Sequence, residues 1–198
     1  GYLDLSKLKT AESIKFPETV SGYLDLNSLT KAENLSLPQV VGGYLNLNSL
    51  TSISDFIFPK NVGSYLELNK LKAATNVKLP TIIGDYLNLS SLTDASYLTF
   101  PTKVNGYLNL SSLTTANNIS LPNTISGSLD LSSLITTNGL TLPDNINGYL
   151  NITSLKKLET LNLPNNIKGK IFTSFGVFTK DTLEQYLNNK EELTKKTK

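Results

Sequence analysis

The chain contains no cysteine, histidine, methionine, tryptophan or arginine. Without cysteine there is no disulfide framework and no thiolate nucleophile, and without histidine no serine has a histidine base to activate it. Zinc-ligand pairs and a phosphate-binding glycine motif are also absent, so we expect no cofactor, no metal and no catalytic activity. Arginine provides bidentate contacts to phosphate and bases, and its absence argues against a nucleic-acid partner. No apolar run is long enough to span a membrane.

Eight consecutive repeats of 21 residues fill residues 1–168 without an insertion or deletion. We number the positions of each repeat from 1 to 21. Positions 3, 5, 8, 14, 16 and 20 are apolar in every copy, and position 17 is always proline. A fixed short period is typical of a solenoid, in which each repeat is one coil that buries its apolar face against its neighbours. The sequence predicts one solenoid over residues 1–168, followed by a cap over residues 169–198.

Two stretches of each repeat, at positions 2–5 and 14–16, alternate between apolar side chains and others. Such alternation predicts short half-buried strands, each stacked about 4.8 Å from its equivalent in the next coil. Proline at position 17 ends the second strand, and glycine at position 21 or 1 allows the turn into the next coil. We therefore predict an all-β, right-handed solenoid with two parallel sheets and a short C-terminal helix.

Positions 11–16 follow the pattern Ala-x-x-Leu-x-Leu, as in the segment 116–121, and Leu-Pro-x-x-Val/Ile comes next. This pattern resembles the core of leucine-rich repeats, particularly the bacterial surface-protein type, and the two alternating stretches are similar to receptor L-domain solenoids. The Asn that forms a buried ladder in many leucine-rich repeats has no fixed equivalent here, although position 6 is always Ser, Asn or Thr. The resemblance implies binding of a protein or glycan at a cell surface, outside the cell, and implies no catalytic residues.

The first candidate surface is a column of tyrosines at position 2, which points outward if positions 3 and 5 point inward. Rings about 4.8 Å apart can stack on one another and fasten coil to coil, or they can form an aromatic platform for sugar rings or a partner chain. Ser128 interrupts this column. Its members considered for ligand binding are Tyr23, Tyr44, Tyr65, Tyr86 and Tyr107.

The second candidate is the polar column at position 4, which holds acidic residues and asparagines. Paired carboxylates can act as acid and base on a glycoside or bind a cation, and Asp4, Asp25 and Glu67 are the residues that would carry this chemistry. Only Asp4 and Asp25 are neighbours, and half of the column is Asn. A solvated strand face explains the same residues, because interspersed amides limit repulsion between stacked charges.

The third candidate is the pair of variable columns at positions 13 and 15, which corresponds to the ligand-reading face of leucine-rich repeats. Such variation suits either a recognition surface or a neutral solvated face. The candidate ligand residues here are Asn34, Ser36, Asp55, Ile57, Asn76, Lys78, Tyr97 and Thr99.

After Gly169 the repeat decays into an aromatic segment and a helical pattern. Asp181–Glu184 resembles a capping box, and the apolar residues that follow lie near one helical face. We expect Phe172, Phe175 and Phe178 to cover the last coil, with a helix that docks a partner as the alternative.

Coil 1 has the complete apolar set but nothing precedes it that could cover it. We expect further coils or a cap before Gly1, or else self-association of two copies at this end. The leading functional hypothesis is a scaffold that binds a protein or cell-surface ligand. A structural spacer and a carbohydrate-binding module that uses the tyrosine column are the alternatives.

Overall fold

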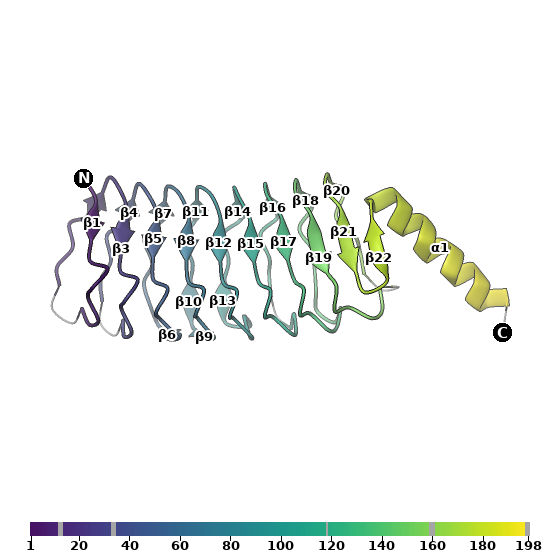
Figure 1. Ribbon diagram of the computed structural model, residues 1–198, viewed down its shortest axis with the longest axis horizontal. Coiled ribbons are helices and arrows are strands. Elements are labelled where there is room, and N and C mark those ends of the chain that lie inside the picture. The colour runs from purple at the N-terminus through teal and green to yellow at the C-terminus, as the bar shows by residue number, and fades with distance from the viewer. Residues whose placement is uncertain (12–13, 33–34, 118, 159–160, 197–198) are drawn as a thin grey trace.

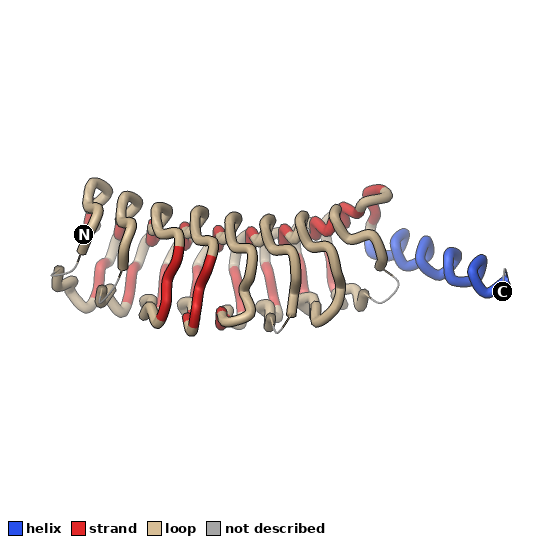
Figure 2. The backbone as a smooth tube through the Cα atoms, turned by 90° about the horizontal axis from the view of Figure 1, so that it is seen from below, coloured by secondary structure: helices blue, strands red, loops and turns tan. Residues whose placement is uncertain are grey.

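The chain forms a right-handed β-solenoid in which each repeat is one coil, followed by a single C-terminal helix (Figure 1). The computed structural model describes residues 1–11, 14–32, 35–117, 119–158 and 161–196, with side chains as far as residue 190. Figure 2 shows the coils side by side along the long axis, with helix α1 (Lys180–Lys196) leading away from the last coil. The predicted all-β solenoid is therefore confirmed.

The first long sheet is built from positions 3 and 4, as predicted. Except for the last strand, each strand pairs in parallel with its equivalent in the next coil, so that Leu3 lies opposite Leu24 and Leu24 opposite Leu45. The strands, in their order across the sheet, are β1 (Leu3–Asp4), β3 (Leu24–Asp25), β5 (Leu45–Asn46), β8 (Leu66–Glu67), β12 (Leu87–Asn88), β15 (Leu108–Asn109), β17 (Leu129–Asp130), β19 (Leu150–Ile152), β21 (Ile171–Thr173) and β22 (Gly176–Phe178).

The second long sheet lies at positions 19 and 20, after the proline, and the prediction that placed it at positions 14–16 was wrong. Position 20 is always Val or Ile, and β-branched side chains favour strands. The proline at position 17 has no N–H to donate, so pairing is re-established only beyond it. The strands are β2 (Thr19–Val20), β4 (Val40–Val41), β7 (Asn61–Val62), β11 (Ile82–Ile83), β14 (Lys103–Val104), β16 (Thr124–Ile125), β18 (Asn145–Ile146) and β20 (Asn166–Ile167).

Two small parallel sheets occupy the rest of the coil, in coils 3 to 5 only among the described residues. Positions 10–12 pair between β6 (Ser52–Ser54) and β9 (Ala73–Thr75). Positions 14–15 pair between β10 (Val77–Lys78) and β13 (Leu98–Thr99), and Ile57 makes a single bridge to Lys78. The predicted second strand thus exists as a local feature of three coils.

The core is a stack of aliphatic layers along the axis of the solenoid. The apolar positions inferred from the repeat are the buried ones; in coil 2, for example, Leu24, Leu26 and Leu29 are fully buried. The prolines of coils 2 to 8 are buried as well, so proline contributes to the packing in addition to ending the preceding stretch. Each coil closes its first corner with a turn in which the N–H of position 8 donates to the carbonyl of position 5, as from Leu29 to Leu26 at 3.0 Å.

Glycine at the boundary between repeats is required by close contact between coils. Neither Gly63 nor Gly84 has a positive φ angle, so this turn does not depend on the left-handed backbone that glycine favours. A Cβ on Gly84 would instead overlap the carbonyl oxygen of Gly63 in the coil before. The absence of a side chain therefore lets two backbones approach at this corner.

The C-terminal segment closes the first sheet with a hairpin before the helix begins. Strand β22 pairs antiparallel with β21, which ends the run of parallel strands. Phe178 packs against the core and Leu183 of α1 is fully buried. Phe172 does not cover the last coil as expected; it lies on the outside of the sheet, with its ring edge-on to Tyr149 at 5.6 Å.

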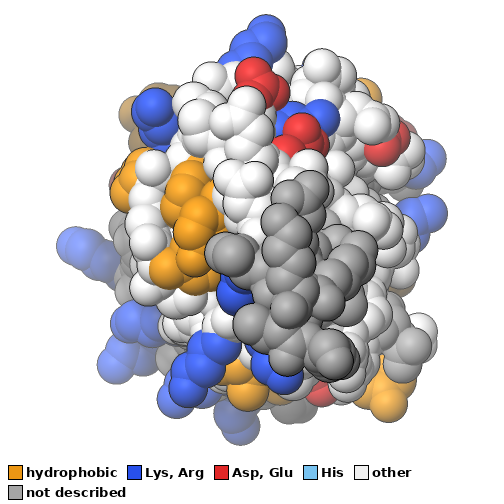
Figure 3. Space-filling model, turned by 90° about the vertical axis from the view of Figure 1, so that its right-hand side faces the viewer, with side chains coloured by type: hydrophobic (Ala, Val, Ile, Leu, Met, Phe, Trp, Pro, Cys, Tyr) orange, Lys and Arg blue, Asp and Glu red, His pale blue; other side chains and the backbone are white. Residues whose placement is uncertain are grey.

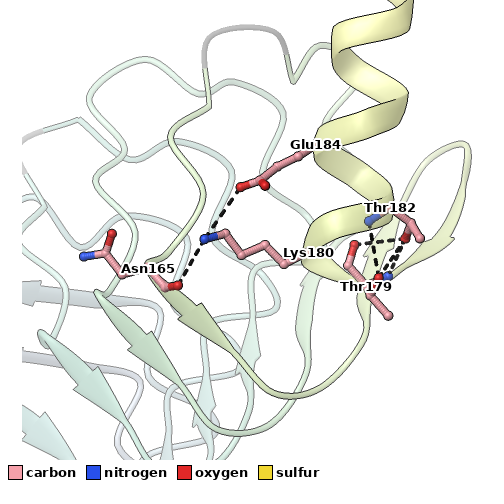
Figure 4. Close-up of polar contacts among 5 residues, drawn as sticks. All are labelled: Asn165, Thr179, Lys180, Thr182 and Glu184. Carbon is pink, nitrogen blue, oxygen red and sulfur yellow. Dashed lines mark hydrogen bonds and ion pairs between the residues drawn. The ribbon is translucent and has the colours of Figure 1, made fainter.

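The helix starts at a capping box, but this box begins at Thr179 and not at Asp181 as predicted. The N–H of Thr182 donates to Oγ1 of Thr179, and the N–H of Thr179 donates to Oγ1 of Thr182, so Thr179 rather than Asp181 is the N-cap (Figure 4). The ammonium of Lys180 donates to the carbonyl of Asn165 at 3.0 Å and lies 3.6 Å from Glu184. The contact with Asn165 attaches the first turn of α1 to coil 8, and the ion pair with Glu184 lies within the helix.

Candidate functional site

Five tyrosines of coils 1 to 5 form a continuous stack on the outer side of the first sheet. Successive ring centroids from Tyr2 to Tyr86 are 4.6–4.7 Å apart, and the planes diverge by at most 16°. Because each ring between the two ends has a neighbour on both faces, its faces are covered by other tyrosines. The geometry matches the coil-fastening interpretation, and an aromatic platform for sugars would require free ring faces. Burial raises the pKa of Tyr23, Tyr44 and Tyr65 above the ordinary tyrosine value.

The stack ends between Tyr86 and Tyr107. The hydroxyl of Tyr86 donates to Oε1 of Glu67 at 2.7 Å, whereas the hydroxyl of Tyr107 donates to Oδ2 of Asp130 at 3.2 Å. Ser128 leaves a space in coil 7, and across it the rings of Tyr107 and Tyr149 lie 6.2 Å apart at 48°. Tyr107 is therefore separated from the other four candidate tyrosines by its orientation.

Position 4 has a structural function that the sequence analysis missed. In seven coils its Asp or Asn side chain accepts a hydrogen bond from the backbone N–H of position 6, at 2.8–3.3 Å, as Asp25 does from Asn27. This Asx turn ends the strand and starts the corner. The recurring pattern of Asp or Asn two residues before Ser, Asn or Thr was the available signal.

Coil 4 departs from this rule because Glu67 has a longer side chain. Glu67 accepts hydrogen bonds from Tyr86 and from Nδ2 of Asn88, and the N–H of Asn69 donates instead to Oδ1 of Asn48 in the coil before. The carboxylate at this site thus joins the tyrosine stack to coil 5.

One carboxylate of this column, Asp4, has a pKa that is shifted by its local hydrogen bonds. Hydrogen bonds from the hydroxyl and backbone of Ser6 lower the pKa of Asp4, whereas a general acid needs a raised pKa. Within the described part of the chain, no group of three acidic side chains gathers in a way that could hold a metal ion.

Positions 13 and 15 lie on the returning part of the coil, away from the tyrosine column, and this face is hollowed. One depression of about 730 Å³ is lined by Asp55 and Ile57, among others, and a second of about 640 Å³ shares Ser36 and Ile57 with it. A third of about 440 Å³ is lined by Asn76, Tyr97 and Thr99. The structure therefore brings most of the third candidate set to the edges of three adjoining hollows.

Two large hydrophobic side chains stand out from this face. Ile57 is 77% exposed between the first two hollows, and Tyr97 is 68% exposed at the third. Lys78 is exposed at position 15 of the next coil, and its backbone forms a parallel β-bridge with that of Ile57. Asn34 lies outside the described residues.

The residue types at position 13 also reflect the backbone. Asp55, Asn76 and Gly139 all have positive φ angles, of 49°, 54° and 73°. Asn, Asp and Gly tolerate this conformation best, so part of the composition of this column is set by the turn. Position 15 has no such constraint, and its side chains are the better indicators of a recognition surface.

Hydroxyl side chains at position 6 form a ladder along coils 6 to 8. The hydroxyls of Ser111, Ser132 and Thr153 each donate to the position-6 carbonyl of the coil before, at 3.5 Å. These long contacts are weak individually but repeat along the solenoid.

At the C-terminal end, hydrophobic side chains are exposed beside the helix, as the space-filling view from that end shows (Figure 3). The large ones are Phe175, Val177 and Tyr186, and the rings of Phe175 and Tyr186 stack at 5.1 Å.

These features define a β-solenoid of 21-residue coils. No family model, no curated protein and no solved structure matches the chain. No helix of the described residues is both long and apolar enough to cross a membrane.

Proposed function

We propose that this chain is a non-enzymatic interaction scaffold of the leucine-rich-repeat type, which binds a protein ligand at a cell surface through positions 13 and 15. The observation that carries the proposal is Ile57, a largely exposed aliphatic side chain between two hollows of about 730 and 640 Å³. An exposed apolar residue flanked by concave surface is typical of the anchors around which protein interfaces are built.

The test compares two isoleucines on different faces. Ile57→Asp places a charge between the hollows, and Ile82→Asp makes the same change on the outside of β11, where Ile82 is 51% exposed. Wild-type protein and both variants are applied to arrays of extracellular proteins and of glycans. We expect protein binding that Ile57→Asp removes and Ile82→Asp retains. Equal loss in both variants, or equal retention, would contradict the assignment of this face.

A structural spacer is the second candidate, and the tyrosine stack supports it. Stacked rings 4.6–4.7 Å apart and cross-coil hydrogen bonds connect successive coils, which stiffens a rod. This function predicts that wild-type protein binds no member of either array. Glycan binding that is lost on replacing Tyr44, Tyr65 and Tyr86 by Ala would instead favour the carbohydrate-binding module.

A further inference from the structure

Three Asn-Gly dipeptides occur in the chain, at residues 105–106, 138–139 and 147–148. Asn-Gly is the dipeptide most prone to spontaneous deamidation, because glycine has no side chain to obstruct attack by its backbone nitrogen on the asparagine side chain. The reaction requires that nitrogen to be free and the backbone to be able to turn. In the fold, the three dipeptides differ in whether the glycine nitrogen is hydrogen-bonded and in how closely the neighbouring coil approaches.

Two of them are held in the contacts between coils. The N–H of Gly106 donates to the carbonyl of Asp85 at 2.9 Å, and the N–H of Gly148 donates to the carbonyl of Gly127 at 2.7 Å. A Cβ on either glycine would lie 2.7 Å from the carbonyl carbon of the residue that accepts its hydrogen bond. Attack at these sites therefore requires the neighbouring coils to separate.

The dipeptide at Asn138 is different on each count. It lies in an exposed turn at positions 12 and 13 of coil 7, and Gly139 has a φ of 73°. Among the described residues, the N–H of Gly139 donates no hydrogen bond and the side chain of Asn138 makes none. A Cβ on Gly139 would lie no closer than 3.1 Å to its nearest neighbour, the carbonyl oxygen of Ala116.

We infer that Asn138 is a site of spontaneous covalent modification, in which it is converted to aspartate and isoaspartate while Asn105 and Asn147 are protected. The nitrogen of Gly139 forms a bond to Cγ of Asn138, and the bond from Cγ to Nδ2 breaks. Ammonia leaves with the proton that Gly139 loses, and a succinimide ring remains. Water then opens the ring at either carbonyl. The product carries a new negative charge next to the position-13 column of coil 7, and the isoaspartate form also lengthens the backbone of that coil.

The test is incubation of the whole protein in mildly alkaline buffer made with isotopically labelled water, followed by proteolysis and mass spectrometry. The water that opens the succinimide leaves a labelled oxygen in each deamidated residue. We expect modification at Asn138 at least about 100-fold faster than at Asn105 or Asn147, because the latter two need local opening of the coil stack. In concentrated urea the three sites should react at similar rates. Asn138→Gln should remove the acidic species that isoelectric focusing detects in aged wild-type protein. Comparable rates at all three sites in the folded protein, or an unmodified Asn138, would overturn the inference.

Discussion

Tyr86 and Tyr107 occupy the same position in adjacent coils, yet their hydroxyls point in opposite directions along the solenoid. Tyr86 donates to Glu67 in coil 4, and Tyr107 donates to Asp130 in coil 7. The one position of this column in the eight repeats that is not tyrosine, Ser128, lies two coils beyond Tyr86 and next to the coil of Tyr107. A repeat protein propagates such a local change because every residue contacts its own equivalents.

The tyrosine stack should stabilise the solenoid in proportion to the number of ring neighbours. Tyr44→Ala removes two stacking contacts and Tyr2→Ala removes one. At about 0.5–1.5 kcal/mol per pair beyond burial, we expect Tyr44→Ala to cost about 1–3 kcal/mol more than a residue with no stacking partner. Urea unfolding followed by circular dichroism measures the difference. Tyr97→Ala, on an exposed unstacked ring, is the control and should change the free energy of unfolding by about 0.5 kcal/mol or less.

Stability should fall at alkaline pH. Burial and the hydrogen bond to Glu67 raise the pKa of Tyr86, and burial raises the pKa of Tyr44 and Tyr65. Below the ordinary tyrosine pKa of about 10 these groups are protonated in both states, so their contribution is complete. Above it the unfolded chain releases its protons first, and stability is lost as the pH rises through the raised pKa values of the folded state.

Two measurements check this pH dependence. Tyrosinate absorbance should show late-ionising residues in the folded protein, and the free energy of unfolding should decline above a pH of about 10. Tyr86→Phe keeps the ring but removes one titrating hydroxyl, so its decline should be shallower. Titration of all tyrosines together at the ordinary value would contradict the raised pKa values.

Much of the fold was predictable because the period and the apolar positions are simple consequences of stacking. Leu24 and Leu26 are buried for the reason that the sequence indicated. The second sheet was misplaced because a short alternation such as that at Leu35 and Leu37 resembles a strand, although pairing depends on which backbone groups remain free beyond Pro38. The hollows beside Ile57 could not be predicted, since they arise from the shape of several loops together. The Asx turn at Asp25 was readable in principle, but its side chain also fitted a solvated face.

The Asx turns predict that the polar column at position 4 tolerates Asp but not Ala. Asn109 accepts a hydrogen bond from the N–H of Ser111 at 3.0 Å. Asn109→Ala removes the acceptor and should cost about 1 kcal/mol, whereas Asn109→Asp keeps it and should be nearly neutral once salt screens the repulsion from Asp130 in the next coil. The free energy of unfolding, measured in urea for both variants, should be lower for Asn109→Ala than for Asn109→Asp. An Asp variant as unstable as the Ala variant would show that the amide acts in some other way.

The corner where coils touch should be the least tolerant part of the surface. A methyl group on Gly84 would meet the carbonyl oxygen of Gly63, a backbone atom that cannot rotate away, whereas one on Gly1 would meet nothing within 4 Å. We expect Gly84→Ala to destabilise the protein by about 1–3 kcal/mol through overpacking, and Gly1→Ala to have no measurable effect. Because the φ angle of Gly84 is not positive, backbone conformation does not account for the destabilisation. Thermal and urea unfolding of the two variants test this directly, and hydrogen exchange at Gly84 and Asp85 should report faster local opening in the first. Equal stability of both variants would mean that adjacent coils can separate at this corner without loss of packing.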